Sequence, residues 1–226
     1  MYDEVFTSPN FGYPSRGTQG RQGQQIIGIG VHISGGEFPG NHAWIMNPNA
    51  KASYNVLVKR DGKAVHYVAP ENTAWSHGAI RSSSWPLLKQ GVNPNVYTLS
   101  VARVGSNQNL WTPEQMDTIV NIIRTWGRQF NFPTAWPHVF GHKHIDAVNR
   151  WYCPGNPFLK ELYARLAIPE PSLTPIPPTN DLWHRVIAGS YRDEHTAQMI
   201  RGNLIRMGVT GAFIETITDE ELKRRS

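Results

Sequence analysis

The residues best suited to do chemistry in this sequence are one cysteine and two histidines. Cys153 is the only cysteine of the chain, so it cannot form an internal disulfide and must pack, attack a substrate or bind a metal. His142 lies eleven residues earlier, far enough for a loop to fold back and bring both side chains to one point. His32 follows the apolar run 26–31, at the carboxyl end of an expected strand, where α/β sheets tend to place their chemistry.

Two histidines and a cysteine can bind zinc through three protein atoms and leave a fourth position free, as catalytic zinc sites do. Zinc held by neutral His32, neutral His142 and the thiolate of Cys153 would keep about one net positive charge. That charge lowers the pKa of bound water from ~15.7 toward neutrality and polarises a carbonyl, and amide hydrolysis needs both effects. Two other roles for Cys153 stay open on the residues alone: a buried apolar thiol, or a nucleophile with His142 as its base.

The segments around these residues alternate between strand-like and helix-like patterns. Asp61-Gly62 is a strong turn pair and predicts a hairpin between residues 54–59 and 64–69. Further elements are expected as strands at 26–31, 96–103 and 137–140 and a helix at 158–166. His144 would share a face with His142 on an extended segment, in a supporting or surface role. The expected fold is α/β, with a central mixed β-sheet flanked by helices.

The clearest helix begins at Thr112, which can cap it, with Pro113 in the first turn and Gln115 completing a capping box. Apolar residues then recur at helical spacing: Met116, Ile119, Val120, Ile123, Trp126 and Phe130. This stripe predicts a helix that packs one face against the core.

The composition supports a folded core and limits the classes of partner that the chain could bind. Hydrophobic residues make up 39% of the chain and aromatic residues 11%, while no apolar run approaches the ~20 residues that span a bilayer. The start of the chain has neither a basic nor an apolar leader region, so we expect cytoplasmic synthesis without a signal peptide. The net charge of +5 falls entirely in residues 1–178, which suits an anionic polymer as partner. Nucleic acid is disfavoured, because no basic run, zinc finger or RNP-like motif accompanies the charge.

Five segments, in order over about residues 24–167, resemble the type-2 N-acetylmuramoyl-L-alanine amidases, whose fold phage endolysins and peptidoglycan recognition proteins share. The segments with His32, His142 and Cys153 resemble those that carry the three ligands of the family. The five segments are 31–34, 53–63, 68–75, 95–101 and the pair 141–142 with 153–155.

The resemblance implies Zn²⁺ as cofactor, with His32, His142 and Cys153 as its ligands. It also implies that Tyr54 assists the reaction, because one branch of the family carries a tyrosine facing the zinc water. Arg150 could supply a positive charge to the reacting groups.

The resemblance further implies substrate contacts and two departures from the family. Trp75 and His77 would lie along the groove and contact substrate. Many family members carry a glutamate where this chain has Ala102, and Lys or Thr where it has Trp151. The branch with the tyrosine also lacks the glutamate, so Ala102 does not by itself abolish catalysis.

The implied domain layout has four parts. Residues 1–24 form an N-terminal arm and 25–167 the zinc amidase domain. A proline-rich linker at 168–180 leads to residues 181–226, which resemble a SPOR-type wall-binding module of α+β type. Such a module would raise the local concentration of the enzyme on an insoluble wall.

The resulting interpretation is a zinc hydrolase that cleaves the amide bond between N-acetylmuramic acid and L-alanine in peptidoglycan, as an endolysin or autolysin does. Two alternatives remain. The chain could bind peptidoglycan without cleaving it, as some members of this fold do, or it could be a zinc endopeptidase that cuts the stem peptide. Oligomeric state is not predicted.

Overall fold

The fold is known from a computed structural model that describes residues 2–12, 20–78, 80–106 and 110–168. The chain divides into two units, Met1–Ser172 and Leu173–Ser226, and the second lies wholly outside the described residues. The expected SPOR-like module at 181–226 therefore lies outside them, as does the expected linker 168–180 except for its first residue.

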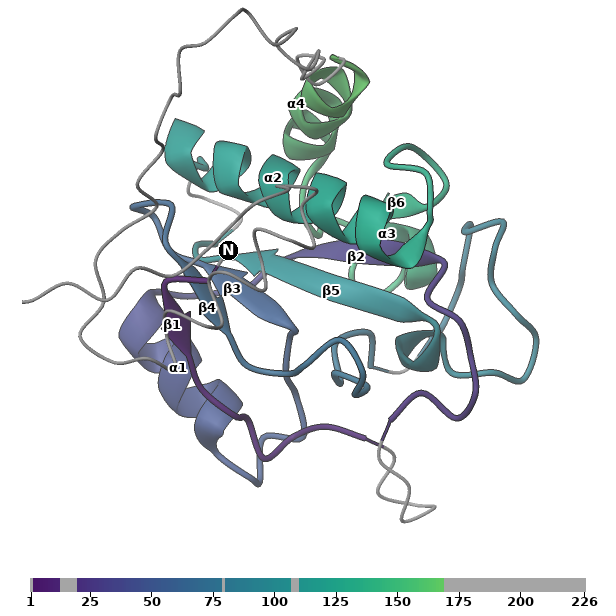
Figure 1. Ribbon diagram of the computed structural model, residues 1–226, viewed down its shortest axis with the longest axis horizontal. Helices are drawn as coiled ribbons and strands as arrows, with labels where there is room; N and C mark the ends of the chain where they lie inside the picture. The colour runs from purple at the N-terminus through teal and green to yellow at the C-terminus, as the bar shows by residue number, and fades with distance from the viewer. Residues whose placement is uncertain (1, 13–19, 79, 107–109, 169–226) are drawn as a thin grey trace, which may run out of the picture. The chain divides into compact units, whose positions relative to one another are not determined.

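A six-stranded mixed sheet forms the centre of the first unit (Figure 1). Its strands in spatial order are β1 (Glu4–Val5), β4 (Ala64–His66), β3 (Val56–Val58), β5 (Thr98–Arg103), β2 (Gly28–Ile33) and β6 (Val139–Gly141). All neighbours run parallel except β3 and β4, which form an antiparallel hairpin. The predicted α/β fold with a mixed sheet is confirmed.

The hairpin turns where its sequence predicts. Gly62 has φ of 82°, which a side chain would disfavour, and the carboxylate of Asp61 accepts a hydrogen bond from the backbone N–H of Lys63. The ordered strand pairing is shorter than the predicted 54–59 and 64–69. The paired residues are Val56–Val58 and Ala64–His66, and beyond them the Asn55 side chain donates to the Val68 carbonyl.

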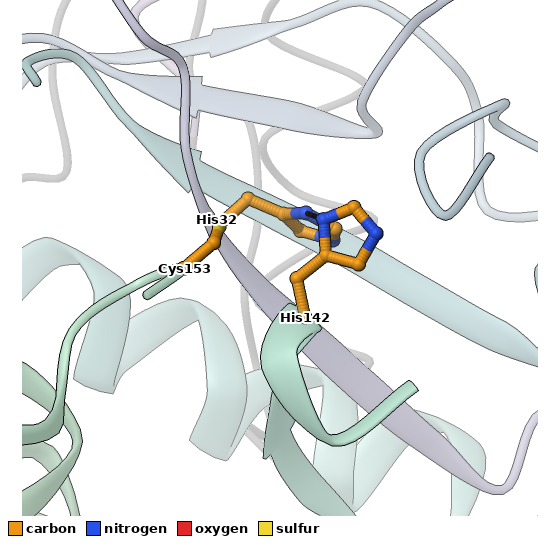
Figure 2. Close-up of side chains that lie close together, drawn as sticks. All are labelled: His32, His142 and Cys153. Atoms are coloured by element: carbon orange, nitrogen blue, oxygen red, sulfur yellow. Dashed lines mark hydrogen bonds between the residues drawn. The ribbon is translucent and has the colours of Figure 1, made fainter. Parts of the chain in front are cut away.

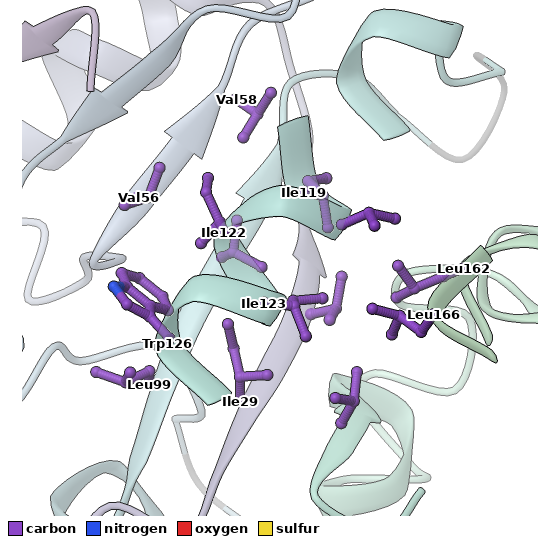
Figure 3. Packing of buried hydrophobic residues seen from close by; sticks show 14 of the residues in the cluster. Ile29, Val56, Val58, Leu99, Ile119, Ile122, Ile123, Trp126, Leu162 and Leu166 are labelled. Atoms are coloured by element: carbon purple, nitrogen blue, oxygen red, sulfur yellow. The ribbon is translucent and has the colours of Figure 1, made fainter. Parts of the chain in front are cut away.

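Two helices cover one face of the sheet, α2 (Pro113–Phe130) and α4 (Asn156–Ala167) (Figure 1). The capping box at Thr112 and Gln115 is present, as predicted, and the helix ends at Asn131 in a left-handed conformation. The apolar stripe of α2 packs against alternate residues of the central strands and against α4 (Figure 3). The labelled members of this cluster are Ile29, Val56, Val58, Leu99, Ile119, Ile122, Ile123, Trp126, Leu162 and Leu166.

The opposite face carries α1 (Phe38–Met46), a helix that the sequence patterns did not predict. Ile45 packs there on Leu57, Val65 and Ala102, which point away from α2. A second unpredicted helix is the single turn α3 (His142–Ile145). The expectation of an extended segment at His142 and His144 is therefore wrong, because Asp146 N–H returns to the His142 carbonyl at 3.0 Å and closes a turn.

The N-terminal arm contributes to the sheet. Its strand β1 pairs with β4, and the buried side chains of Ser8 and Asn10 both donate to the carbonyl of Ile45 on α1. Buried Arg21 donates to backbone carbonyls around the start of β5, including that of Thr98 at 2.9 Å. Within the part of the chain that the structure describes, no helix is long and apolar enough to span a membrane.

Candidate metal centre

Three segments that are distant in sequence bring the expected ligands together at one edge of the sheet. His32 lies near the end of β2, and His142 is the first residue of α3, directly after β6. Because β2 and β6 are parallel neighbours, their carboxyl ends meet. The loop before α4 brings in Cys153, whose sulfur accepts the Ile33 backbone N–H at 3.2 Å. The three donor atoms all lie within 4.8 Å of one another (Figure 2).

The spacing of the two histidine donors is close to that of two nitrogens on a tetrahedral zinc ion. The Nδ1 atoms of His32 and His142 are 3.0 Å apart. Two nitrogens on a tetrahedral zinc at 2.0–2.1 Å would be about 3.3 Å apart, so a small adjustment suffices. The far nitrogen of His142, Nε2, is 2.9 Å from the carbonyl oxygen of His77. A carbonyl only accepts, so Nε2 carries the proton and Nδ1 of His142 presents its lone pair to the site.

Burial sets the protonation states of the donors in the absence of an ion. It lowers the pKa of His142 to about 4 and holds the pKa of His32 well below its usual range, so both imidazoles are neutral at pH 7. Burial also raises the pKa of the Cys153 thiol to about 11, only partly offset by the Ile33 N–H and nearby arginines. A neutral imidazole is already a ligand, whereas the thiol must lose its proton when a metal binds.

His77 is close to both histidine ligands but is not exposed to a groove. Its side chain is 1% exposed, its Nε2 is 2.9 Å from the Thr98 hydroxyl, and its ring stacks 5.3 Å from that of His32. The substrate contact expected of His77 stays a prediction, and in this structure its ring is buried beside His32. The sequence offered no signal for its buried place, which depends on the fold bringing residue 77 over β2.

Tyr54 and Arg150 lie near the cluster, as expected. The Tyr54 ring is 5.2 Å from the ring of His32, and burial raises the pKa of its phenol, so it stays protonated at all ordinary pH values. Arg150 is exposed on the loop that carries Cys153. Burial is the main cause of the pKa shifts of His32, His142 and Cys153, and the charge of Arg150 acts on all three in the downward direction.

Three further positions noted in the sequence differ in how far they are buried. The indole N–H of Trp75 donates to the Gly12 carbonyl, so this half-buried ring is held against the N-terminal arm. Ala102 is fully buried beside Leu57 and Val104, and supplies no acid or base. Trp151 is 67% exposed, two residues before Cys153, and packs on Tyr152.

His144 turns away from the ligand cluster. Its Nδ1 accepts the Gly141 backbone N–H at 3.0 Å, and its ring packs on Trp136 with centroids 4.6 Å apart. A cleft of about 480 Å³ opens on that side, and its lining residues are Ser84, Trp136, His144, Asn156, Leu159, Lys160 and Tyr163. His144 therefore belongs to the wall of this cleft.

Comparisons with known proteins agree with this picture. The sequence model of the N-acetylmuramoyl-L-alanine amidase family matches residues 22–156. A selenomethionine derivative of AmpD has a similar structure, with a TM-score of 0.54 and 20% identity over 72% of this chain and 93% of that one. PlyL is similar with a TM-score of 0.51 and 20% identity, over 74% of this chain and 94% of that one. A search of curated protein sequences gave no significant match.

The structural neighbours share the α/β fold. The cluster of two histidines and one cysteine lies at the edge of this chain's sheet. The match of the family model covers more than half of the sequence. This chain belongs to the N-acetylmuramoyl-L-alanine amidase family.

Proposed function

We propose that this protein is a zinc-dependent hydrolase of the amide bond between N-acetylmuramic acid and L-alanine in peptidoglycan. The observation that carries the proposal is the convergence of His32, His142 and Cys153, whose donor atoms lie within 4.8 Å of one another in a family of amidases. Three ligands leave the fourth position of a tetrahedral ion for water and substrate.

His32 and His142 would hold zinc through Nδ1, and Cys153 would hold it through its sulfur. When bound, zinc would supply Lewis acidity, which polarises an amide carbonyl and lowers the pKa of bound water, so that a hydroxide nucleophile is available near neutral pH. The buried walls of the site keep both imidazoles neutral and ready to bind. Because the thiol pKa is raised to about 11, loading releases the Cys153 proton.

Tyr54 would stabilise the reacting amide. Its raised pKa keeps the hydroxyl protonated, so it can donate a hydrogen bond to the oxygen that becomes negative as the carbonyl is attacked. Arg150 would add positive potential at the exposed rim, where its long side chain can meet an anionic group of the substrate.

Peptidoglycan is the proposed partner. Trp75 would support the wall of the substrate groove from its position against the N-terminal arm. We retain the proposals that residues 181–226 bind the cell wall, that 168–180 link them to the catalytic domain, and that the protein acts on the wall as an endolysin or autolysin.

Digestion of purified peptidoglycan tests this function. Zinc-loaded protein should release intact stem peptides with new L-alanine amino termini and no new reducing sugars, and the Cys153→Ser variant should release none. Thr125→Ala, which changes an exposed hydroxyl on α2, serves as a control and should keep full activity.

Each alternative has its own signature in the same digest. Fragments cut within the stem peptide would identify a zinc endopeptidase. Bound zinc and bound peptidoglycan without any new amino terminus would identify a recognition protein, a reading that Ala102 keeps open because it offers no general base.

A further inference from the structure

Two buried ring nitrogens beside the proposed metal site lack hydrogen-bond partners among the described residues: Nε2 of His32 and Nδ1 of His77. Buried polar nitrogens are nearly always paired, so an unpaired pair on neighbouring rings calls for an explanation. The two rings stack with centroids 5.3 Å apart and an angle of 27° between their planes.

The facing edges of these rings meet over Gly30. A methyl group at Gly30 would lie 2.6 Å from Cε1 of His77 and 3.2 Å from Nε2 of His32. Cε1 lies between the two nitrogens of an imidazole, so Nδ1 of His77 is one bond away from the atom that faces Gly30. The absence of a side chain at Gly30 creates the space.

Hydrogen bonding fixes the tautomer of His77. The Thr98 hydroxyl donates its proton to the Pro94 carbonyl at 2.7 Å, so its oxygen can only accept from Nε2 of His77 at 2.9 Å. Nε2 of His77 therefore carries the proton. Nδ1 of His77 is left as an acceptor.

His32 must present a donor at its unpaired nitrogen when it binds zinc. If Nδ1 of His32 binds zinc, as its 3.0 Å approach to Nδ1 of His142 indicates, the proton of the neutral imidazole must sit on Nε2. An unpaired donor on His32 and an unpaired acceptor on His77 then lie on neighbouring rings. Ligating histidines almost always donate their second N–H to such an acceptor, usually a carboxylate or a carbonyl.

We propose that His77 is a positioning residue that orients both histidine ligands, His142 through its backbone carbonyl and His32 through its ring Nδ1. The backbone contact is already made at 2.9 Å. The ring contact requires His32 to take its metal-binding tautomer and the two rings to approach each other more closely. This inference rests on the proposed zinc site. It adds a hydrogen-bond acceptor for the His32 ring, and this acceptor is an imidazole nitrogen instead of the usual carboxylate or backbone carbonyl.

Two substitutions test the roles of the two ring nitrogens of His77 separately. His77→Asn places an amide oxygen close to where Nδ1 stands and keeps the acceptor for His32. His77→Gln reaches the position of Nε2, keeps a donor for Thr98 and loses the acceptor. Both variants retain the backbone carbonyl that holds His142. His66→Gln, at a half-buried imidazole on β4 away from the cluster, is the matched control because its Nδ1 is also buried without a partner among the described residues.

The readouts are zinc affinity, measured by competition with a chromophoric chelator, and the absorption bands of the Co²⁺-substituted protein. We expect His77→Gln to bind zinc about 10- to 100-fold more weakly and to shift the cobalt bands, because an unfixed ligand loses about that much affinity. His77→Asn and His66→Gln should remain close to the unaltered chain.

Equal affinity and equal cobalt spectra for His77→Gln and the unaltered chain would overturn the inference and leave the proposed function standing. No zinc binding by the unaltered chain would overturn both. If His77→Gln does not fold, Thr98→Val replaces it, with Thr98→Ser as its control. Thr98→Val removes the hydroxyl that fixes the His77 tautomer and should weaken zinc binding several-fold, whereas Thr98→Ser keeps the hydroxyl and should not. Equal zinc affinities of these two variants would again overturn the inference.

Discussion

The two faces of β2 differ in kind although they belong to one six-residue strand. On the face toward α2 and α4, Ile29 and Val31 are fully buried in the main apolar cluster. On the other face, Gly30 and His32 alternate with them, and the rings of His77 and Phe140 fill the space that Gly30 leaves. One face packs aliphatic side chains, and the other packs the rings of histidines and Phe140 against Gly30.

This difference indicates how the fold separates stability from chemistry. The apolar face gains free energy from close packing, with no polar group to satisfy. The polar face holds neutral imidazoles and a protonated thiol in low-dielectric surroundings, an arrangement that stabilises little by itself and is suited to a cation. Changes on the two faces should therefore affect different measurements.

Removing a ligand from the polar face should give the largest effect. Cys153→Ser replaces the only sulfur ligand with a hydroxyl that binds zinc poorly, so zinc affinity should fall roughly a thousandfold or more. Unfolding of the metal-free variant in denaturant should change little, because the thiol makes one backbone contact, to Ile33. Unchanged zinc affinity by chelator competition would exclude Cys153 as a ligand.

A truncation on the apolar face should give the opposite result. Trp126→Ala removes a fully buried ring from the centre of the cluster and should lower the free energy of unfolding by about 3–5 kcal/mol in urea titration. The fraction that remains folded should bind zinc as tightly as the unaltered chain. A stable variant with weakened zinc binding would contradict the separation of the two faces.

Acid should destabilise the metal-free protein through its polar face. The folded-state pKa of His142 is lowered to about 4 from an ordinary value near 6.5, so the unfolded chain takes up this proton first. The stability is fully present above pH 6.5 and falls as the pH drops toward 4, by on the order of 3 kcal/mol for this group. Urea titrations across this range should show the loss, and His142→Asn should flatten it; an equal slope in both proteins would disprove the assignment.

A single methyl group at Gly30 tests the space between the rings. Gly30→Ala would bring its methyl to 2.6 Å from a buried carbon of His77, which is hydrogen-bonded and cannot swing away freely. We expect a destabilisation of about 1–3 kcal/mol and weaker zinc binding. Gly40→Ala on α1 is the control, since nothing lies within 4 Å of its added methyl, and it should be nearly neutral. Similar results for the two glycines would show that the space over Gly30 is not tight.

Much of the scaffold was readable from local patterns. The turn at Asp61-Gly62 and the capping box at Thr112 depend on neighbours within a few residues, and both are present. The amphipathic stripe of α2 is also correct. Ile122, at 2% exposed, joins the buried face in addition to the residues predicted for it.

Contacts from segments that are apart in sequence help to hold both of the helices that were not predicted. Helix α1 contains Pro39 and Gly40, which are poor helix formers, and it is held by Ser8 and Asn10 from the arm. The turn at His142 is closed by local bonds and fixed by the Lys143 N–H, which donates to the Cys153 carbonyl at 2.9 Å.

Part of the candidate site could be predicted from the sequence, and part of it depends on contacts between distant segments. His32, His142 and Cys153 come together as the sequence predicts, and Tyr54 lies beside them. The buried place of His77 could not be foreseen, because it follows from the Asn95 side chain, which accepts the His77 backbone N–H at 3.1 Å across eighteen residues. The assignment of these residues to zinc and to catalysis remains a proposal.

Reconstitution of the metal-free protein with zinc tests the central claim most directly. Peptidoglycan is digested at increasing ratios of zinc to chain, and new L-alanine amino termini are counted at each ratio. The account predicts no release without zinc and a linear rise that stops at about one zinc per chain, as expected for a single three-ligand site. Full release by chelator-treated protein, or one tightly bound zinc with no release at any ratio, would contradict it.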